Sequence, residues 1–298
     1  MEKLLFTGGT GFLGNNIMPI LEKDYDVTTI GITPKDMLNC NLANDVPVLP
    51  EHYDVVLHAC GKAHSVPKTE AEKKLFFDVN YQGTVNLCTA LEKVGVPKSF
   101  VFISTLSVYG TKSGEMIDEN YPLNGTTPYA KSKIMAEEYL TQWAAEHNVV
   151  LSILRPSLMV GPNAPGNFGA MVDGIKKGRY VNINHGVARK SLLMVYDIAN
   201  VLPKLVNKGG VYNICDDSNP SYGELSAVIC KQMGKSNPLS IPMWVAKPLA
   251  WVGNLIPKFP FNSYRLQKLT QSCTYSNAKI KSSLDWQPMN VLDNLKVV

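Results

Sequence analysis

The sequence has no arrangement of cysteines typical of a disulfide framework or a zinc site. Its six cysteines include no Cys-x-x-Cys pair, and no cluster of histidines accompanies them. The first residues also lack a signal peptide, because Glu2 and Lys3 precede an apolar run of strand length only. We therefore expect reduced thiols, a cytoplasmic location and no metal site.

Long apolar runs are missing as well, and charge of one sign is not concentrated anywhere. The most apolar segment, residues 241–261, is interrupted by four prolines and two lysines. It falls short of the roughly 18 apolar residues that a membrane span needs, so we expect short helices packed on a core or at an oligomer contact. The net charge of +4 is mild, and its short basic clusters indicate solvated helix faces and no nucleic-acid surface.

A glycine-rich turn is present close to the start of the chain. Residues 7–14 read Thr-Gly-Gly-Thr-Gly-Phe-Leu-Gly, between an apolar run and a helix-like segment at 12–22. A strand, a glycine turn and a helix N-terminus together bind a dinucleotide pyrophosphate, since glycines let the backbone approach the phosphates and the helix dipole attracts the anion. A plain tight turn is the alternative. The candidate cofactor-binding residues here are Gly8, Gly11, Phe12, Leu13 and Gly14.

Continuous apolar strands alternate with helices over the first half of the chain. We expect these strands near 26–30, 54–59, 99–105 and 149–154, and helices near 12–22, 70–94 and 129–147. This alternation predicts an α/β fold, a doubly wound parallel sheet of the Rossmann type, with its site at the carboxyl ends of the strands.

The pattern changes after Gly161, where turns become frequent and the elements shorten. Helices are expected near 169–177, 197–206 and 222–233, and strands near 179–183 and 211–214. We therefore predict a dinucleotide-binding domain over residues 1–160 and a smaller, partly interleaved α/β substrate lobe over residues 161–298.

The end of the second strand lacks the carboxylate that dinucleotide folds usually place there for the adenosine ribose. Gly31 stands at the expected position, and Lys35 follows just beyond it. Without the carboxylate a 2′-phosphate is not repelled, and Lys35 could pair with one, so NADP is a candidate beside NAD. Alternatively, Gly31 only turns the chain and the ribose contacts backbone and water.

A small-residue loop follows the strand at 54–59 and could pass under the cofactor. It includes Ala59 and Gly61, which we take as cofactor-binding candidates. His58 and His64 lie in the same stretch, but no carboxylate or cysteine joins them at metal-ligand spacing, so we expect no metal there.

Tyr129 and Lys133 are four residues apart at the start of a predicted helix, so they share a helix face. An ammonium beside a buried phenol favours the phenolate, and we expect it to lower the pKa of Tyr129 and make it an acid or base. Thr105, at the end of a neighbouring strand, could share the same proton. The alternative is a surface tyrosine stacked over a lysine.

Together these motifs resemble the extended short-chain dehydrogenase/reductase superfamily, and within it the nucleotide-sugar epimerase/dehydratase family. The resemblance spans nearly the whole chain. It includes the turn at 7–14, Asn80, Ser104-Thr105 before Tyr109, Tyr129-x-x-x-Lys133, Arg155-Pro156 and Leu284-Asp285-Trp286. The stretch 241–266 is similar to the branch that acts in bacterial surface-polysaccharide biosynthesis.

The resemblance implies an enzyme that moves a hydride at C4 of a nucleotide-linked hexose or N-acetylhexosamine, with UDP as the expected carrier and NAD or NADP as the cofactor. Thr105, Tyr129 and Lys133 would be catalytic; Lys133 would also hold the nicotinamide ribose, Asn80 would lie at the cofactor, and Arg265 and Asn167 would contact the substrate. Family members often pair as homodimers, here through helices near 70–94 and 129–147.

Two departures from the family pattern narrow the reaction. Leu106-Ser107 stand where the 4,6-dehydratases of the family have Asp-Glu, which argues against water elimination. Gly31 at the ribose position favours a 4-ketoreductase slightly over a 4-epimerase with permanently bound NAD. A non-catalytic NAD(P)-binding sensor or scaffold on the same fold is the alternative from another class.

Overall fold

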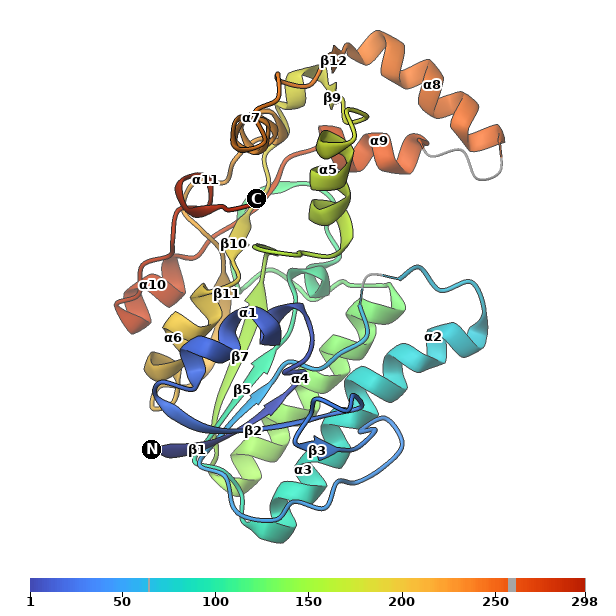
Figure 1. The fold of residues 1–298 in the computed structure, drawn as a ribbon. Coiled ribbons are helices and arrows are strands. Elements are labelled where there is room, and N and C mark those ends of the chain that lie inside the picture. Colours follow the sequence, from blue (N-terminus) through green and yellow to red (C-terminus); the bar gives the residue numbers. More distant parts are fainter. Residues whose placement is uncertain (64, 257–260, 298) are drawn as a thin grey trace.

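The computed structural model describes residues 1–63, 65–256 and 261–297. Seven parallel strands form the central sheet, in the order β11-β7-β5-β4-β1-β2-β3 (Figure 1). They are β1 (Glu2–Thr7), β2 (Tyr25–Gly31), β3 (Leu38–Asn39), β4 (Val55–His58), β5 (Ser99–Ile103), β7 (Val150–Pro156) and β11 (Gly210–Ile214). The strand order reverses between β1 and β4, so a crevice for a ligand is expected at their carboxyl ends. The predicted doubly wound α/β fold is confirmed.

Helices cover both faces of this sheet, which is why its strands are nearly continuous apolar runs. One face packs against α1 (Phe12–Leu21), α6 (Asp197–Leu205) and α10 (Ala278–Leu284). The other packs against α3 (Gly83–Val94) and α4 (Pro128–His147). Successive strand residues alternate between the two cores, as the two-residue period of a strand requires.

The predicted helix over 70–94 is present, but it is interrupted by a π-helical segment. It runs as α2 (Glu70–Phe77), η1 (Asp78–Gln82) and α3. The Thr69 side chain caps α2 at its start, in a capping box with Glu72. Asn80 lies inside η1. Because π segments insert a residue into a helix and often mark functional sites, this position supports Asn80 as a candidate site residue.

A smaller lobe lies beyond the carboxyl ends of β5 and β7, in the upper part of Figure 1. It has its own core, to which β8, α5, β10, α7 and α11 contribute. Its helices are α5 (Gly166–Lys176), α7 (Tyr222–Gln232), α8 (Met243–Leu255), α9 (Ser263–Thr270) and α11 (Val291–Asn294). Its short strands pair as β8 (Leu158–Val160) with β10 (Leu192–Met194), and β9 (Asn182–Ile183) with β12 (Ser240–Ile241).

The two halves of the chain cross between these parts. β11 and α6, from the second half, join the main sheet and one of its cores. In the other direction, β6 (Gly114–Ile117) pairs with β13 (Cys273–Tyr275). The interleaving anticipated from the sequence is therefore visible, while the division into domains at residue 160 stays a prediction.

One local prediction differs from the structure. The strand expected over 179–183 is shorter, because a turn at Lys177 and Gly178 leaves only β9 extended. In the apolar segment 241–261, the expected short helix is present as α8, which packs against α9; residues 257–260 lie outside the described part. Within the described ranges, no helix has both the length and the apolar character to cross a membrane.

Candidate active site

The glycine turn between β1 and α1 has the geometry of an anion site. Gly8 has φ +82°, and a Cβ on it would lie 2.9 Å from the Cys60 amide nitrogen. A Cβ on Gly14 would lie 2.1 Å from the Gly9 carbonyl oxygen, so α1 can pack this close only with glycine there. No side chain caps α1 at Gly11. The N–H groups at the start of α1, at Phe12 and Leu13, therefore face a position that an anionic phosphate fits.

Thr7 fixes the loop after β4 beside this turn. Its hydroxyl oxygen accepts hydrogen bonds from the amides of Ala59 (3.1 Å) and Cys60 (3.0 Å). It also lies 2.7 Å from Nδ1 of His58, whose Nε2 is 2.9 Å from the Thr84 hydroxyl. Complete burial lowers the pKa of His58 to about 3, with a further contribution from the charge of Lys133. His58 is thus a neutral structural link.

Among the described residues, His58 belongs to no group of side chains that could hold a metal ion. His64, the other histidine of that stretch, lies outside the described residues. In the part of the chain that the structure describes, no three His, Cys, Asp or Glu side chains are grouped to hold a metal ion.

Asn80 joins the loop after β4 to α4, the helix that carries Tyr129. Its Oδ1 accepts a hydrogen bond from the Lys62 amide (2.7 Å), and its Nδ2 donates to the Ser132 hydroxyl (2.9 Å). Ser132 in turn donates to the Tyr129 carbonyl oxygen (2.9 Å). A Cβ on Gly61 would lie 3.0 Å from Oδ1 of Asn80, so position 61 must be occupied by a small residue. Ser132 is a positioning residue that sequence reasoning missed.

Tyr129, Thr105 and Lys133 come together at the carboxyl end of β5. The Tyr129 hydroxyl lies beside the Thr105 side chain, which favours the ionised form of the phenol. Lys133 donates a hydrogen bond from Nζ to the Ile103 carbonyl oxygen (2.8 Å), and its ammonium lies 4.4 Å from the centre of the Phe102 ring. Both the lysine and the threonine are buried. The structure therefore brings together the three side chains that the sequence pattern singled out.

The protonation of this group differs from the sequence-based expectation. Burial raises the pKa of Tyr129 above its ordinary value, and the Thr105 side chain only partly opposes this. The expected lowering by Lys133 is wrong, because desolvation dominates. Burial also lowers the pKa of Lys133 to about 8, although the nearby Cys60 and Glu137 favour its charged form. Tyr129 is thus a neutral phenol at neutral pH.

One turn further along α4, Glu137 forms a buried ion pair with Arg155. The Arg155 Nη2 to Glu137 Oε2 distance is 2.5 Å, and both side chains are about 95% buried. Ser104 also donates to Glu137, and Arg155 donates to the Tyr109 hydroxyl (3.0 Å). The sequence analysis named the arginine motif but missed Glu137. The four-residue spacing of 129, 133 and 137 on one helix face was the available signal.

A carboxylate does lie at the end of β2, supplied by Asp36. Its oxygens lie 2.5 and 2.9 Å from where a Cβ on Gly31 would be, so the side chain occupies the space that Gly31 leaves. Oδ2 accepts hydrogen bonds from the amide (3.0 Å) and the hydroxyl (2.8 Å) of Thr33. Oδ1 is buried without a hydrogen-bond partner. The prediction that this strand end lacks a carboxylate is therefore wrong. The chain turns back within five residues of Gly31 and places the Asp36 carboxylate at the strand end.

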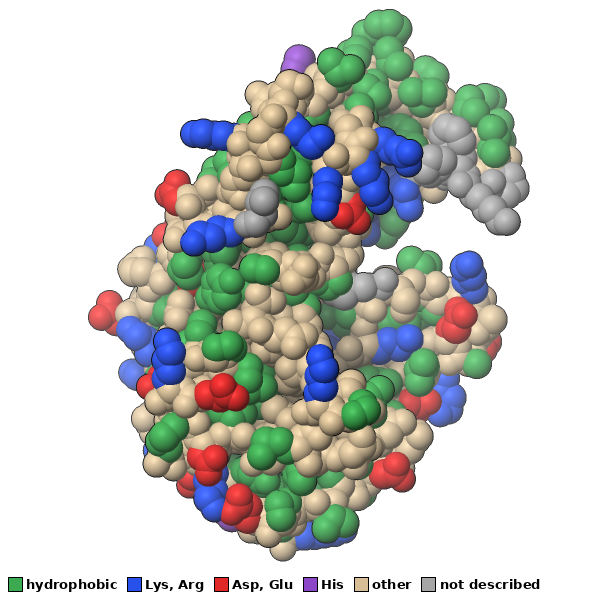
Figure 2. All heavy atoms as spheres, viewed as in Figure 1, with side chains coloured by type: hydrophobic (Ala, Val, Ile, Leu, Met, Phe, Trp, Pro, Cys, Tyr) green, Lys and Arg blue, Asp and Glu red, His purple; other side chains and the backbone are tan. Residues whose placement is uncertain are grey.

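The two predicted substrate residues lie on the smaller lobe. Asn167 is in the first turn of α5 and Arg265 is on α9, where the Asn262 side chain caps the helix, and both are exposed. Figure 2 shows a hollow between this lobe and the part that contains the sheet, with Lys and Arg side chains gathered on the lobe beside it. The contact of Asn167 and Arg265 with a substrate stays a prediction.

Comparisons with known proteins agree with this arrangement. The family described as NAD dependent epimerase/dehydratase matches residues 4–215. The chain is 28% identical to N-acetyl-alpha-D-glucosaminyl-diphospho-ditrans,octacis-undecaprenol 4-epimerase of Escherichia coli O157:H7, over 95% of this chain and 89% of that protein. It is 27% identical to UDP-glucose 4-epimerase of Vibrio cholerae, over 98% and 92%.

The fold is also that of solved structures. The structure of RMD from Pseudomonas aeruginosa complexed with NADPH superposes with a TM-score of 0.73 at 21% identity, covering 98% of this chain and 95% of the other. The family match extends over most of the chain and includes the glycine turn, Asn80, Thr105, Tyr129 and Lys133. This chain therefore belongs to the NAD dependent epimerase/dehydratase family.

Proposed function

We propose that the protein transfers a hydride at C4 of a hexose or N-acetylhexosamine carried on a diphosphate, with the sugar nucleotide as the first candidate. The observation that carries this is the grouping of Tyr129 and Thr105 beside the buried Lys133 at the carboxyl end of β5. A phenol held in this way can exchange a proton with a sugar oxygen. The nicotinamide dinucleotide supplies or accepts the hydride when it is bound.

Each residue has a distinct part in this proposal. Tyr129 gives a proton to the C4 oxygen or takes one from it, and Thr105 shares that hydrogen bond. Lys133 binds the ribose hydroxyls beside Gly61, where a Cβ would lie only 3.4 Å from Nζ. Asn80 keeps the loop and the Tyr129 helix in register. The turn at Gly8, Gly11 and Gly14 holds the pyrophosphate.

The neutral state of Tyr129 supports ketone reduction as the leading reaction. Reduction at C4 converts a carbonyl oxygen into a hydroxyl, which needs a proton donor, and a phenol with a raised pKa is one. Thr105 is followed by Leu106, which is buried, and by Ser107, whose amide donates to the Thr105 hydroxyl (3.1 Å). Neither can perform the acid and base steps of a dehydratase, so a 4-ketoreductase is favoured.

A 4-epimerase is the second candidate, because of Asp36. Its carboxylate lies at the strand end where the adenosine ribose is expected, and its charge opposes a 2′-phosphate. This favours NAD(H) over NADP(H), which removes one reason for preferring a reductase. Epimerases of the family regenerate their NAD within each cycle, and two of the relatives reported above are named as 4-epimerases.

Tyr129→Phe tests the proposed proton transfer. We expect kcat to fall by roughly 10²–10⁴-fold, because the general acid is lost. The dinucleotide should still bind, as fluorescence titration would show. Tyr139→Phe, the same substitution on the same helix, is the control and should keep its turnover. Near-normal turnover of the Tyr129 variant would refute the assignment.

The fate of the cofactor separates the candidate reactions. A panel of UDP-linked sugars and their 4-keto forms, assayed with NADH and NADPH, should show stoichiometric consumption of one reduced cofactor for a ketoreductase. An epimerase should interconvert C4 epimers with catalytic NAD and no net consumption. Tight dinucleotide binding without turnover of any sugar in the panel would instead favour the non-catalytic sensor.

A further inference from the structure

Helix α8 exposes its large apolar side chains and buries its small ones. The buried residues are Ala246, Ala250 and Gly253. On the opposite side, the exposed fractions are 75% for Trp244, 63% for Trp251 and 63% for Leu255. Leu249, Val252 and Ile256 extend this exposed surface. An ordinary amphipathic helix of a globular protein turns its large apolar residues inward, so this face is made to contact something outside the chain.

The positions of the tryptophans make the face unusual. The chain has four tryptophans. Trp143 and Trp286 are each 3% exposed in cores, whereas the other two stand on α8, seven residues apart and therefore on one side of the helix. Figure 1 shows α8 at the outer edge of the smaller lobe, and Figure 2 shows apolar side chains covering it. Exposed tryptophan on one helix face is characteristic of the boundary between water and lipid.

The charge around α8 is of one sign. From residue 225 to residue 284 the sequence contains no Asp or Glu, but it contains seven Lys and one Arg. This stretch carries a formal charge of +8, and the whole chain carries only +4, so the remaining residues carry −4. The two helices of this region, α8 and α9, contain Lys247, Arg265 and Lys268 and no acidic residue, which is complementary to an anionic surface.

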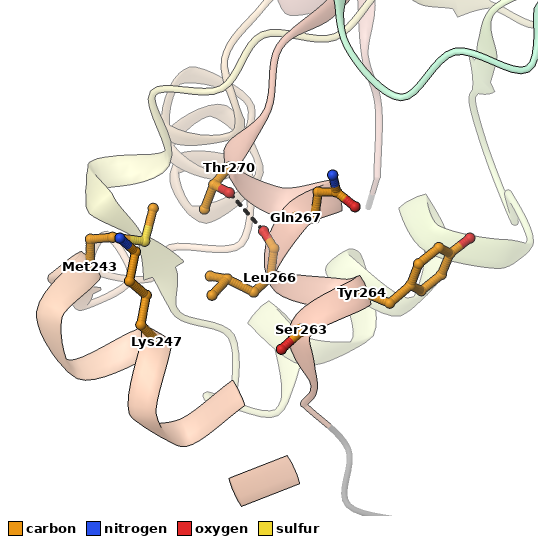
Figure 3. Close-up of a pocket in the computed structure, with 7 residues that line it drawn as sticks. All are labelled: Met243, Lys247, Ser263, Tyr264, Leu266, Gln267 and Thr270. Carbon is orange, nitrogen blue, oxygen red and sulfur yellow. Dashed lines mark hydrogen bonds between the residues drawn. The ribbon is translucent and has the colours of Figure 1, made fainter. Parts of the chain in front are cut away.

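A groove beside this face adds to the same picture. It has a volume of about 450 Å³ and lies between α8 and α9 (Figure 3). Met243 and Lys247 line it from α8, and Leu266 faces them from α9. Lys247 is three residues from Trp244 and four from Trp251, so it is a neighbour of both on the helix surface. A cation beside apolar lining suits a lipid phosphate with its acyl chains.

We propose that α8 docks this protein on an anionic lipid bilayer, with Trp244, Trp251 and Leu255 in the headgroup region and the surrounding lysines on the lipid phosphates. The helix lies on the membrane and does not span it. This inference goes beyond the proposed reaction and does not depend on it. A second protein or a second copy of the chain offers no comparable reason for a region of 60 residues without an acid.

Sedimentation of the full chain with vesicles tests the proposal. The protein should bind vesicles of equal phosphatidylglycerol and phosphatidylcholine, more weakly at high salt, and bind pure phosphatidylcholine less. Trp244→Ala and Trp251→Ala should each weaken binding by about tenfold, and the double variant by about a hundredfold, from the loss of buried apolar surface. Trp244→Phe with Trp251→Phe should keep most of the affinity.

The controls separate docking from other effects. Val48→Ser alters a valine that is 91% exposed on the part of the molecule that contains the sheet, and it should leave binding to both types of vesicle unchanged. Lys247→Glu should weaken binding to the anionic vesicles but not to the neutral ones. Binding to neither type of vesicle, or binding that the double alanine variant leaves unchanged, would overturn the proposal. So would conversion of an oligomer to a monomer by that variant in sedimentation velocity, since a second copy would then cover α8.

Discussion

Asp36 offers a direct test of how this chain selects its dinucleotide. Asp36→Asn removes the charge but keeps a side-chain oxygen that can accept from Thr33, so the turn after β2 should survive. The carboxylate lies within 2.9 Å of a Cβ position on Gly31, at the strand end where the adenosine ribose is expected. The variant therefore changes the charge that faces the ribose with little change in shape.

The expected magnitudes follow from the charge and its hydrogen bond. A hydrogen bond from a ribose hydroxyl to a charged acceptor is worth about 1.5–3 kcal/mol, so NAD should bind about tenfold more weakly to the variant. At about 5 Å and an effective dielectric constant of about 20, two unit charges repel by about 3 kcal/mol. Screening by salt reduces this repulsion, and we expect NADP to bind about tenfold more tightly.

Titration of NAD and NADP against the wild type and the variant measures both effects. The ratio of the two dissociation constants should shift by about a hundredfold in favour of NADP. Asp45→Asn, which removes one charge from an exposed position in the next connection, between β3 and β4, is the control and should leave the ratio unchanged. A ratio that Asp36→Asn changes by less than about threefold, or a wild type that prefers NADP, would refute the role of Asp36.

Two further predictions concern the buried charges of α4. Glu137→Ala leaves Arg155 buried without its partner, so we expect the free energy of unfolding to fall by about 3–5 kcal/mol and Tm by on the order of 10 °C in calorimetry; a change within 1 °C would contradict this. The folded-state pKa of Lys133, lowered to about 8 from 10.5, means that the unfolded chain binds more protons between those values, so the stability of the wild type should rise across that pH range. Denaturant unfolding of the wild type and of Lys133→Met measures this effect. Between pH 8 and 10.5 the free energy of unfolding of the wild type should rise by about 3 kcal/mol more than that of the variant, and parallel pH profiles for the two proteins would count against it.

Local signals in the sequence were sufficient to predict the sheet and the grouping of Thr105, Tyr129 and Lys133. The apolar strands, the glycine turn and the four-residue spacing of Tyr129 and Lys133 are all readable over short stretches, and the structure has the doubly wound parallel sheet that they predict. The cap of α4 at Thr127 is local as well. Short-range patterns of this kind are fixed by strand and helix periodicity, which does not depend on distant residues.

Contacts set by the tertiary structure were out of reach. Nothing in the order of residues shows that Asp36 folds back onto Gly31, because this depends on the path of a turn. The rise in the pKa of Tyr129 results from its burial under neighbouring elements, which outweighs the cation expected beside it. The π segment around Asn80 has no compositional mark, and the exposure of Trp244 on α8 is a property of packing and not of periodicity.

The position of β11 in the sequence limits how segments can be recombined between enzymes of this family. This strand pairs with β7 only after the chain has passed through the start of the smaller lobe, and α6 enters the core on the way. A chimera joined at a single point after β7 would pair β7 of one enzyme with β11 of the other and pack a foreign α6 against one face of the sheet. Recombination must instead cut on both sides of the α6–β11 segment, which makes the replacement of individual loops a far easier genetic route to a new sugar specificity than the transfer of an entire lobe.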